Sequence, residues 1–445
     1  MSIIGKRAIF LCLALGMTLF LFAWPTVYPT GTTLYKPDKS YNGYTLYSPL
    51  GNGGQGLEVG SEPYEMPGVI FLIDMNGNIV HEWKTPFRAT FGRILRNGNL
   101  LVACSDSKKI PGRIGIEPYA IGGAQGWIYE LDWDGNIVWS FFDGNQHHDF
   151  QRLPNGNLLY IAFEKVPKDL QKKVRGGIKG SEFPDGTMIN DLIVEVTPEG
   201  ERVWEWHAND HFDPDVDIMA LTHPRQEWAH GNGLDVMEDG NILYDARHTD
   251  TVYMINKKTG KIIWRFGNIA YLDKQTGQIE YKDPRSTDTF GGQHNVQLIR
   301  PGLPGAGNIL IYDNGMHADT SRAVEIDPKT LKVVWEEKIG DSTMGRFGRN
   351  HFSSFISSAQ RLPNGNTLVC DGANGRLFEI THEQEIVWEY VNPFEGDALW
   401  HYVVYRAARY GPDHCPQFKD LPPAKGAAVG PINVDHFQIP PMAQQ

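Results

Sequence analysis

The chain has 445 residues, of which 41% are hydrophobic, and it contains 48 glycines and 28 prolines. This length exceeds that of most single domains but suits a repeat architecture with many turns. The formal net charge of −12 excludes a general nucleic-acid-binding function, because contacts to phosphates need a basic surface, whereas an anionic small molecule can still bind in a locally positive cleft.

Residues 1–25 predict a signal peptide or a membrane anchor. Lys6 and Arg7 precede an uncharged run over residues 8–24, which Pro25 ends. This length suits a signal-peptide core or a short membrane helix, and the absence of an A-x-A cleavage site favours a retained anchor. The basic pair would stay cytoplasmic, so we expect the rest of the chain to be periplasmic or outward-facing and membrane-anchored.

Residues 26–67 are rich in Gly, Pro and Tyr and predict a linker or strap, after which a two-part repeat fills residues 68–410. The first half is a strand, an Asn-Gly or Asp-Gly turn and a second strand, as in QRLPNGNLLYIA (151–162) and QRLPNGNTLVC (360–370). The second half is another hairpin that ends in tryptophan, as in IYELDWDGNIVW (128–139). Such dipeptides supply the positive φ that tight hairpin turns require.

Six tryptophans mark the ends of successive repeats, namely Trp83, Trp139, Trp204, Trp264, Trp335 and Trp388. The opening hairpin, 69–83, lacks a first half, which the run WHYVVYRAARY (400–410) from the other end of the chain can provide. The sequence therefore predicts an all-β fold, a six-bladed β-propeller closed by strands from both chain ends. A Pro-rich tail over residues 411–445 is expected to be irregular.

Two insertions interrupt the repeat. Residues 163–190 carry six basic side chains, which as a solvated loop can also steer anions toward the channel. Residues 207–229 carry four aspartates but lack the glycine and the closing glutamate of an EF-hand loop, so they predict a solvated loop and leave a bound calcium open.

Histidines recur at one place in three successive repeats. His147 and His148 stand before the first strand of one unit, His230 before that of the next, and His294 before that of the third. Because the first strand of each propeller blade lines the central channel, we expect these imidazoles to point at a common volume near one mouth.

Arg247 follows the second strand of the His230 unit, at the end that a hairpin returns to the same mouth, and Asn314 holds the matching place in the next unit. An arginine there presents a fork of donors that suits a tetrahedral oxyanion or a carboxylate. The alternative is an ordinary rim arginine paired to Asp245.

These motifs resemble those of the bacterial arylsulfotransferase family, exported enzymes that move sulfuryl groups between phenols without a nucleotide donor. The matching residues, in the family's order and with similar spacing, are His147-His148-Asp149, His230-x-Asn232, Arg247-His248 and Gln293-His294. The phrase SAQRLPNGNTL (358–368) is also similar, and the resemblance covers roughly residues 40–410. The chain departs from the enterobacterial enzymes in having only a short strap where they carry a separate N-terminal β-domain.

The resemblance implies a PAPS-independent, ping-pong transfer from an aryl sulfate donor to a phenolic acceptor through a sulfohistidine. His294 would be the nucleophile, with His148, His230 and Arg247 binding and polarising the sulfuryl group. The substrate-binding residues would be His147, Asn232, Asn314 and His248. No cofactor and no metal are expected, and the partners would be the small-molecule donor and acceptor, with the membrane if the N-terminal segment is uncleaved.

Two other functions stay open. The inward histidines can ligate a metal, although no carboxylate accompanies them at fixed spacing and Arg247 opposes a cation. A non-catalytic propeller of the cell envelope that binds a ligand or a protein is equally compatible with the fold, since a propeller alone argues for no function. TGKIIW (259–264) echoes the tryptophan repeat of quinone-dependent dehydrogenases, but those have eight blades and a longer chain.

Overall fold

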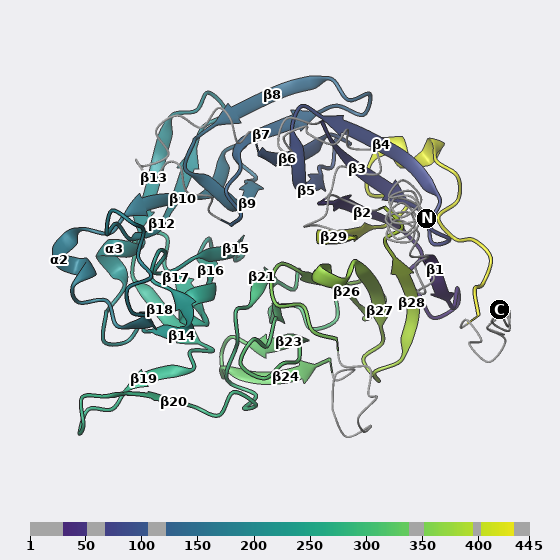
Figure 1. Cartoon of the computed structure of the whole chain (residues 1–445). Helices are drawn as coiled ribbons and strands as arrows, with labels where there is room; N and C mark the ends of the chain where they lie inside the picture. Colours follow the sequence, from purple (N-terminus) through teal and green to yellow (C-terminus); the bar gives the residue numbers. More distant parts are fainter. Residues whose placement is uncertain (1–29, 51–66, 106–121, 338–350, 395–401, 431–445) are drawn as a thin grey trace, which may run out of the picture.

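The computed structural model describes residues 30–50, 67–105, 122–337, 351–394 and 402–430. Six antiparallel sheets are arranged in a ring, and each presents its first strand to the centre (Figure 1). The six innermost strands, β29, β5, β9, β15, β21 and β25, together line a cavity of about 520 Å³ in the central channel. The predicted all-β, six-bladed β-propeller is therefore confirmed.

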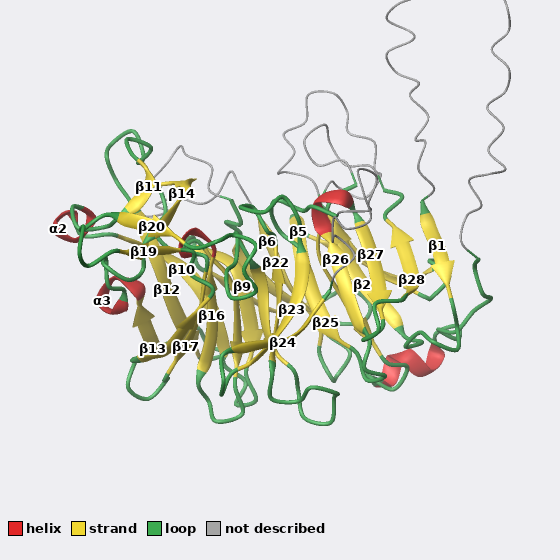
Figure 2. Ribbon diagram, turned by 90° about the horizontal axis from the view of Figure 1, so that it is seen from below, coloured by secondary structure: helices red, strands yellow, loops and turns green. Residues whose placement is uncertain are grey.

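The four middle blades are each built from two hairpins, whereas the first and last blades include strands from both chain ends. Figure 2 shows the strands running along the channel. With strands given from the inside outward, the first two blades are β29-β2-β3-β4 (Val404–Tyr410, Tyr44–Pro49, Gly68–Ile73, Ile79–Thr85) and β5-β6-β7-β8 (Arg88–Ile94, Leu100–Ser105, Gly126–Leu131, Ile137–Phe142). The third and fourth blades are β9-β10-β12-β13 (Gln146–Arg152, Leu158–Lys165, Ile189–Val196, Arg202–His207) and β15-β16-β17-β18 (Gly231–Val236, Ile242–Ala246, Thr251–Ile255, Ile262–Phe266). The last two blades are β21-β22-β23-β24 (His294–Leu298, Ile309–Asp313, Arg322–Asp327, Lys332–Glu336) and β25-β26-β27-β28-β1 (Ser358–Arg361, Thr367–Asp371, Arg376–Ile380, Ile386–Val391, Gly31–Tyr35).

The repeat tryptophans join each blade to its neighbour. The indole N–H of Trp139 donates to the Pro198 carbonyl oxygen (2.7 Å), in the outer turn of the next blade. Trp83, Trp204, Trp335 and Trp388 make the equivalent bond to the following blade, at 2.8–3.1 Å. A large apolar ring with one donor suits this position, because it fills the space between two sheets and also satisfies a turn carbonyl.

Both chain ends close the ring, although their roles differ from the prediction. The run 400–410 contributes a single strand, β29, to the first blade. Residues 26–67, for which the sequence predicts a linker or strap, provide the neighbouring strand β2 and the outermost strand β1 of the last blade. Every residue of β2 is buried, so this strand belongs to the sheet core. Directly before it stands Asn42-Gly43, the dipeptide that also marks turns of the repeat.

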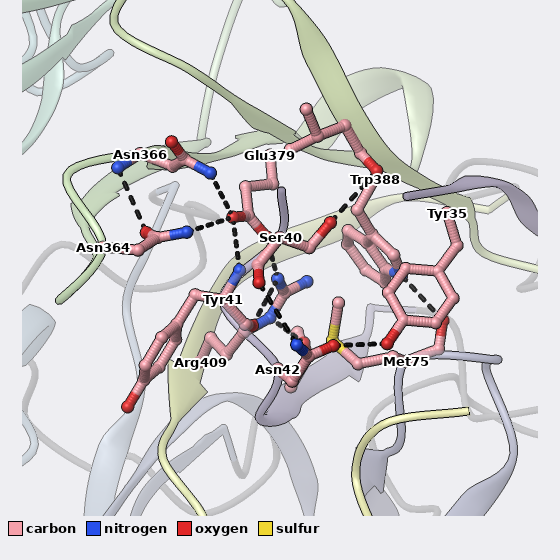
Figure 3. A network of polar contacts seen from close by, with 12 residues as sticks. Tyr35, Ser40, Tyr41, Asn42, Met75, Asn364, Asn366, Glu379, Trp388 and Arg409 are labelled. Atoms are coloured by element: carbon pink, nitrogen blue, oxygen red, sulfur yellow. Dashed lines mark hydrogen bonds and ion pairs between the residues drawn. The ribbon is translucent and has the colours of Figure 1, made fainter. Parts of the chain in front are cut away.

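The closure is held by a buried ion pair between Arg409 and Glu379, whose side chains are both 0% exposed (Figure 3). The same carboxylate accepts hydrogen bonds from the Tyr41 backbone N–H (2.7 Å) and from the Asn366 amide (2.6 Å). Arg409 also donates to Thr45 of β2 (3.0 Å). One polar network thus ties the C-terminal strand, the last blade and the N-terminal segment together.

Removal of one partner from this pair should strongly destabilise the ring. We expect Arg409→Met to lower the free energy of unfolding by about 3–5 kcal/mol, because it leaves Glu379 buried and uncompensated. The denaturant midpoint, converted with an unchanged m-value, measures this loss. Lys36→Met, which removes an exposed ion pair to Glu385, is the matched control and should change the midpoint little. Equal midpoints for the two variants would contradict the closure role.

The two insertions form small elements outside the ring. Residues 163–190 contain the short helix α2 (Lys168–Gln171) and the strand β11 (Gly176–Ile178), which pairs with β14 (Met219–Pro224). The helix α3 (Ala208–His211) opens the second insertion, and β19 (Ala270–Leu272) pairs with β20 (Ile279–Tyr281) beside it. The prediction of a fully solvated acidic loop is wrong for Asp217, which is buried and takes two hydrogen bonds from Arg265 (2.7 and 2.9 Å).

Within the described residues, no helix is long and apolar enough to span a membrane. The predicted signal or anchor, residues 1–25, lies outside the described residues. The described part of the tail carries one 3-10 helix, Pro416–Asp420, from which Phe418 packs edge-on against Tyr44 (4.9 Å between ring centroids).

Candidate active site

The three predicted histidine positions lie on the inner strands of three consecutive blades. His147 and His148 are within β9, His230 directly precedes β15, and His294 begins β21. β15 packs between β9 and β21, so the histidines meet at one end of the channel. His148 and His294 are buried, at 3% and 2% exposure, and His230 is half-buried.

A backbone irregularity aims each of these side chains. The ladder register shifts within β9, β15 and β21 next to the histidine, which marks a β-bulge in each strand. His148 (φ 49°), His230 (φ 54°) and Asn295 (φ 60°) adopt the left-handed conformation. Such residues cost on the order of 1–3 kcal/mol each and concentrate at functional sites, where a bulge redirects a side chain. Three strained positions in register favour a functional role for this end of the channel.

The imidazoles form a connected row. The Nδ1 atoms of His147 and His148 lie 2.8 Å apart, and the rings of His148 and His230 are 4.6 Å apart, edge to face. His230 in turn stacks on His248 at 4.7 Å. Burial lowers the pKa of His148 well below the usual value, and the neighbouring His230 lowers it further. His148 is therefore a neutral imidazole at pH 7.

His294 is fixed by hydrogen bonds on both ring nitrogens. Its Nδ1 lies 2.6 Å from Asn314 Oδ1 and 3.0 Å from the Gly292 carbonyl oxygen, so this nitrogen carries the proton. Its Nε2 accepts a hydrogen bond from the Ile356 backbone N–H (3.0 Å). Burial and the nearby Arg247 hold the pKa of His294 well below its usual value. The ring is thus neutral, with its basic nitrogen on Nε2.

Arg247 is a half-buried cation without an ion-pairing carboxylate. Among the described residues, no Asp or Glu lies within ion-pairing distance, and the guanidinium donates to the Ser354 carbonyl oxygen (3.1 Å) and Met316 Sδ (2.9 Å). The expected alternative, a pair with Asp245, is not formed, because that carboxylate accepts the backbone N–H groups of Asn232 and Val296. Burial lowers the pKa of Arg247, while the nearby carboxylates of Asp250 and Glu227 oppose that shift without pairing to it. An anion is the natural ligand for such a group.

The four predicted substrate-binding residues lie around this centre, and two of them hold neighbouring groups. Asn314 orients His294 and donates to the Ser353 and Ile356 carbonyl oxygens (2.6 and 3.0 Å). His248 donates to the Glu227 carbonyl oxygen (2.7 Å) and stacks on His230.

The other two retain unpaired acceptors. His147 stacks on Phe163 (3.9 Å), and its buried Nε2 lies 3.4 Å from Asp191 Oδ1 without forming a regular hydrogen bond among the described residues. Asn232 donates to the Gln293 carbonyl oxygen (2.8 Å), and its buried Oδ1 has no hydrogen-bond partner within the described structure.

The sequence reasoning missed two residues of the closing strand β29. Arg406 donates to Asp149 (2.9 Å) and to the Asn232 carbonyl oxygen, and its charge contributes to the lowered pKa values of His148 and His294. The buried hydroxyl of Tyr405 has no hydrogen-bond partner among the described residues, although burial raises its pKa and keeps it protonated. The signal was present in the sequence, since WHYVVYRAARY was already predicted to be an innermost strand.

A strained loop covers the same centre. Ile356 (φ 53°) and Ser357 (φ 91°) are left-handed, which is unusual for a β-branched residue. This loop provides the Ile356 N–H to His294 and the Ser354 carbonyl to Arg247. The basic nitrogen of His294 and the guanidinium of Arg247 are thus both hydrogen-bonded to the same strained segment.

The low pKa of His294 predicts how the stability of the protein depends on pH. In the unfolded chain an imidazole takes up a proton below about pH 6.5, whereas His294 in the folded protein stays neutral there. The unfolded state then binds more protons, so this side chain costs stability as the pH falls through that value. Between about pH 7.5 and 5.5 the wild type should lose more unfolding free energy than His294→Asn, measured by urea titration. Identical pH dependences would mean that His294 titrates normally in the folded protein.

Comparison with known proteins places this geometry in a family. The family model described as arylsulfotransferase (ASST) matches residues 55–398, which is most of the chain. No curated protein matches this chain.

Several solved structures are similar to this chain at low identity. A protein of unknown function from Bacteroides caccae is 13% identical, with a TM-score of 0.45, over 82% of this chain and 98% of that one. An inactive virginiamycin B lyase from Staphylococcus aureus with quinupristin is 11% identical, with a TM-score of 0.39, over 78% of this chain and 88% of that one. Hydrazine synthase from Kuenenia stuttgartiensis is 9% identical, with a TM-score of 0.38, over 81% of each chain. At these values the similarities carry no argument, whereas the family match covers β3 to β28 and all the histidines of the site. The chain belongs to the arylsulfotransferase family.

Proposed function

We propose that this protein transfers a sulfuryl group from an aryl sulfate to a phenol by a ping-pong mechanism with a sulfohistidine on His294. Membership of the family supports aryl sulfotransferase activity in general. The observation that carries the finer proposal is the convergence of two neutral imidazoles, His148 and His294, with the unpaired cation Arg247 at one end of the channel. Neutral imidazole is a good nucleophile near pH 7, and an unpaired guanidinium stabilises a transferring anionic group.

In the first half-reaction, His294 Nε2 attacks sulfur, the N–S bond forms and the S–O(aryl) bond breaks. The phenolate leaves with the bonding electron pair, and the ring proton stays on Nδ1, where Asn314 and the Gly292 carbonyl hold it. Attack requires Nε2 to leave the Ile356 N–H, and Arg247 to exchange the Ser354 carbonyl for a sulfuryl oxygen. Once released, the Ile356 N–H is a further donor available to the sulfuryl oxygens.

His230 is the proton-transfer residue in this proposal. Its Nδ1 lies 2.9 Å from Glu227 Oε2, so a carboxylate stands beside the ring that would move the proton. The departing phenolate takes a proton from His230, and in the second half-reaction the same imidazole removes the proton of the acceptor phenol. The acceptor oxygen then attacks sulfur, the N–S bond breaks and His294 is regenerated neutral, so each proton and electron pair is accounted for.

A chromogenic aryl sulfate assay with and without a phenolic acceptor tests the function. We expect turnover with acceptor, initial-rate plots in parallel lines as ping-pong kinetics requires, and one equivalent of phenol without acceptor. A folded protein that releases no phenol from any aryl sulfate would instead favour the ligand- or protein-binding propeller. Release at a rate independent of acceptor would indicate hydrolysis rather than transfer.

We further propose that residues 1–25 export the protein or anchor it in the membrane, on the basis of the basic pair and the apolar run that follows it. Deletion of these residues should leave a folded, soluble protein in the cytoplasm, measured by fractionation against the full-length chain. Full-length protein that is soluble in the cytoplasm without processing would contradict this localisation.

A further inference from the structure

Two histidines and one aspartate converge beside the active site without taking part in the proposed reaction. His223 is in β14, Asp250 follows the 3-10 helix Arg247–Thr249, and His317 lies in the loop after β22. Their nearest ligand atoms all lie within 4.8 Å of one another. His317 Nε2 is 2.8 Å from Asp250 Oδ2, and His223 Nε2 is 3.7 Å from Asp250 Oδ1.

The charge balance of this cluster is incomplete. Asp250 is 0% exposed, and in the part of the chain that the structure describes its carboxylate has no ion pair to a lysine or an arginine. His223 is 2% exposed, and its Nε2 has no hydrogen-bond partner among the described residues. A buried carboxylate beside an unpaired imidazole nitrogen is costly unless a cation occupies the space between them.

The three side chains are also held in place from behind. Asp250 has left-handed backbone (φ 50°), and its Oδ1 accepts the Gly292 N–H at 2.7 Å. The His223 ring stacks on His248 at 4.5 Å, with 18° between the planes. Support of this kind from neighbouring groups is typical of metal ligands, whose orientation it fixes before the ion binds.

We propose that His223, Asp250 and His317 bind one divalent transition-metal ion, with Zn²⁺ as the best match. Two imidazole nitrogens and one carboxylate oxygen form a common three-residue zinc set, which leaves a fourth position for water. With ligand distances of about 2.0–2.2 Å and tetrahedral angles, the His317–Asp250 separation needs to open by only about half an ångström. The ion would lie outside the ring of inward histidines, at a position that no short sequence motif predicts.

The position gives the ion a structural consequence. Asp250 holds the Gly292 N–H, and the Gly292 carbonyl in turn accepts from His294 Nδ1 (3.0 Å). A metal on Asp250 would therefore stabilise the segment that orients His294. The Asp250 carboxylate also interacts electrostatically with the nearby Arg247, so its single negative charge would be shared between the guanidinium and the metal ion. We therefore expect a strong chelator to remove the ion.

The metal content of the purified protein tests the proposal without any substrate, so its outcome is independent of the proposed sulfuryl transfer. After treatment with chelator and dialysis against Zn²⁺, we expect one equivalent per chain by elemental analysis. Co²⁺ in its place should give visible d–d bands of a four- or five-coordinate site. Both signals should be lost in His223→Ala and in His317→Ala, and retained in the control His382→Ala, which removes an exposed histidine of an outer turn.

Three results would overturn the proposal. One is a wild-type chain that holds no Zn²⁺ after dialysis, in which case a protonated His317 compensates Asp250 instead. Another is an equivalent that persists in both histidine variants while circular dichroism shows them folded. The third is metal that disappears in His148→Gln but not in His223→Ala, which would place the ion among the inward histidines.

Discussion

His294→Asn should abolish both the release of phenol in the absence of acceptor and the covalent modification of the protein. Wild-type enzyme mixed with donor alone should release about one equivalent of phenol and then stall, apart from slow hydrolysis. Mass spectrometry should find one added SO₃ group on the peptide that holds His294, stable to base and labile to acid. Asparagine keeps a polar side chain at this buried position but offers no basic nitrogen to the sulfur, so both signals should disappear together.

The neighbouring histidines distinguish the nucleophile from its supporting groups. His148→Asn and His230→Asn should slow the burst and still permit the adduct, because they remove polarisation or proton transfer but leave His294 Nε2 in place. The His230 effect should be larger for aryl sulfates whose phenolate is a poor leaving group, since these depend most on protonation. An adduct mapped to His148 or His230 would contradict the assignment of His294 and leave the fold and the reaction class intact.

Arg247→Lys should lower kcat/KM by about 10²-fold or more while the denaturant midpoint changes little. The guanidinium can place two N–H groups on one sulfuryl oxyanion, whereas lysine offers a single mobile charge. The small change in stability follows from the weak contacts that Arg247 makes in the structure, a backbone carbonyl and a thioether sulfur.

Arg202→Lys is the matched control for this substitution. Arg202 lies on the outer strand β13, half exposed, and pairs with Asp143 and Glu205. Its replacement should leave kcat/KM unchanged. A near-normal rate for Arg247→Lys, or an equal loss in the two variants, would place Arg247 outside the site.

The blade architecture could be predicted from the sequence because every blade repeats the same local signals. The Asn-Gly turns and the terminal tryptophans encode contacts that recur around the ring, such as the Trp139 N–H bond to the next blade. β1 and β2 could not be predicted in this way, because they join the ring by pairing with strands about 360 residues away, β28 and β29, and the Asn42-Gly43 signal before β2 does not reveal that pairing. Long-range pairing of this kind leaves no periodic trace.

The inward histidines could be predicted because their place in the repeat fixes which strand carries them. The protonation and the hydrogen bonds of each side chain could not be predicted, because they depend on contacts from other blades and loops. The bond from the Ile356 N–H to His294 and the bond from Arg247 to the Ser354 carbonyl both come from a loop with no recognisable motif. His223, Asp250 and His317 were missed for the same reason, because three unrelated segments bring them together.

The last strand of the propeller is also the source of Tyr405 and Arg406, which complete the polar centre. During synthesis these two residues leave the ribosome after His147, His148, His230, His294 and Arg247. The three central blades can form their hairpins early. Arg406 and the strand that joins the first and last blades are synthesised only when the chain is nearly complete. A truncated product would hold every histidine of the site and still have an open ring. The polar centre is therefore complete only when β29 has joined the first blade.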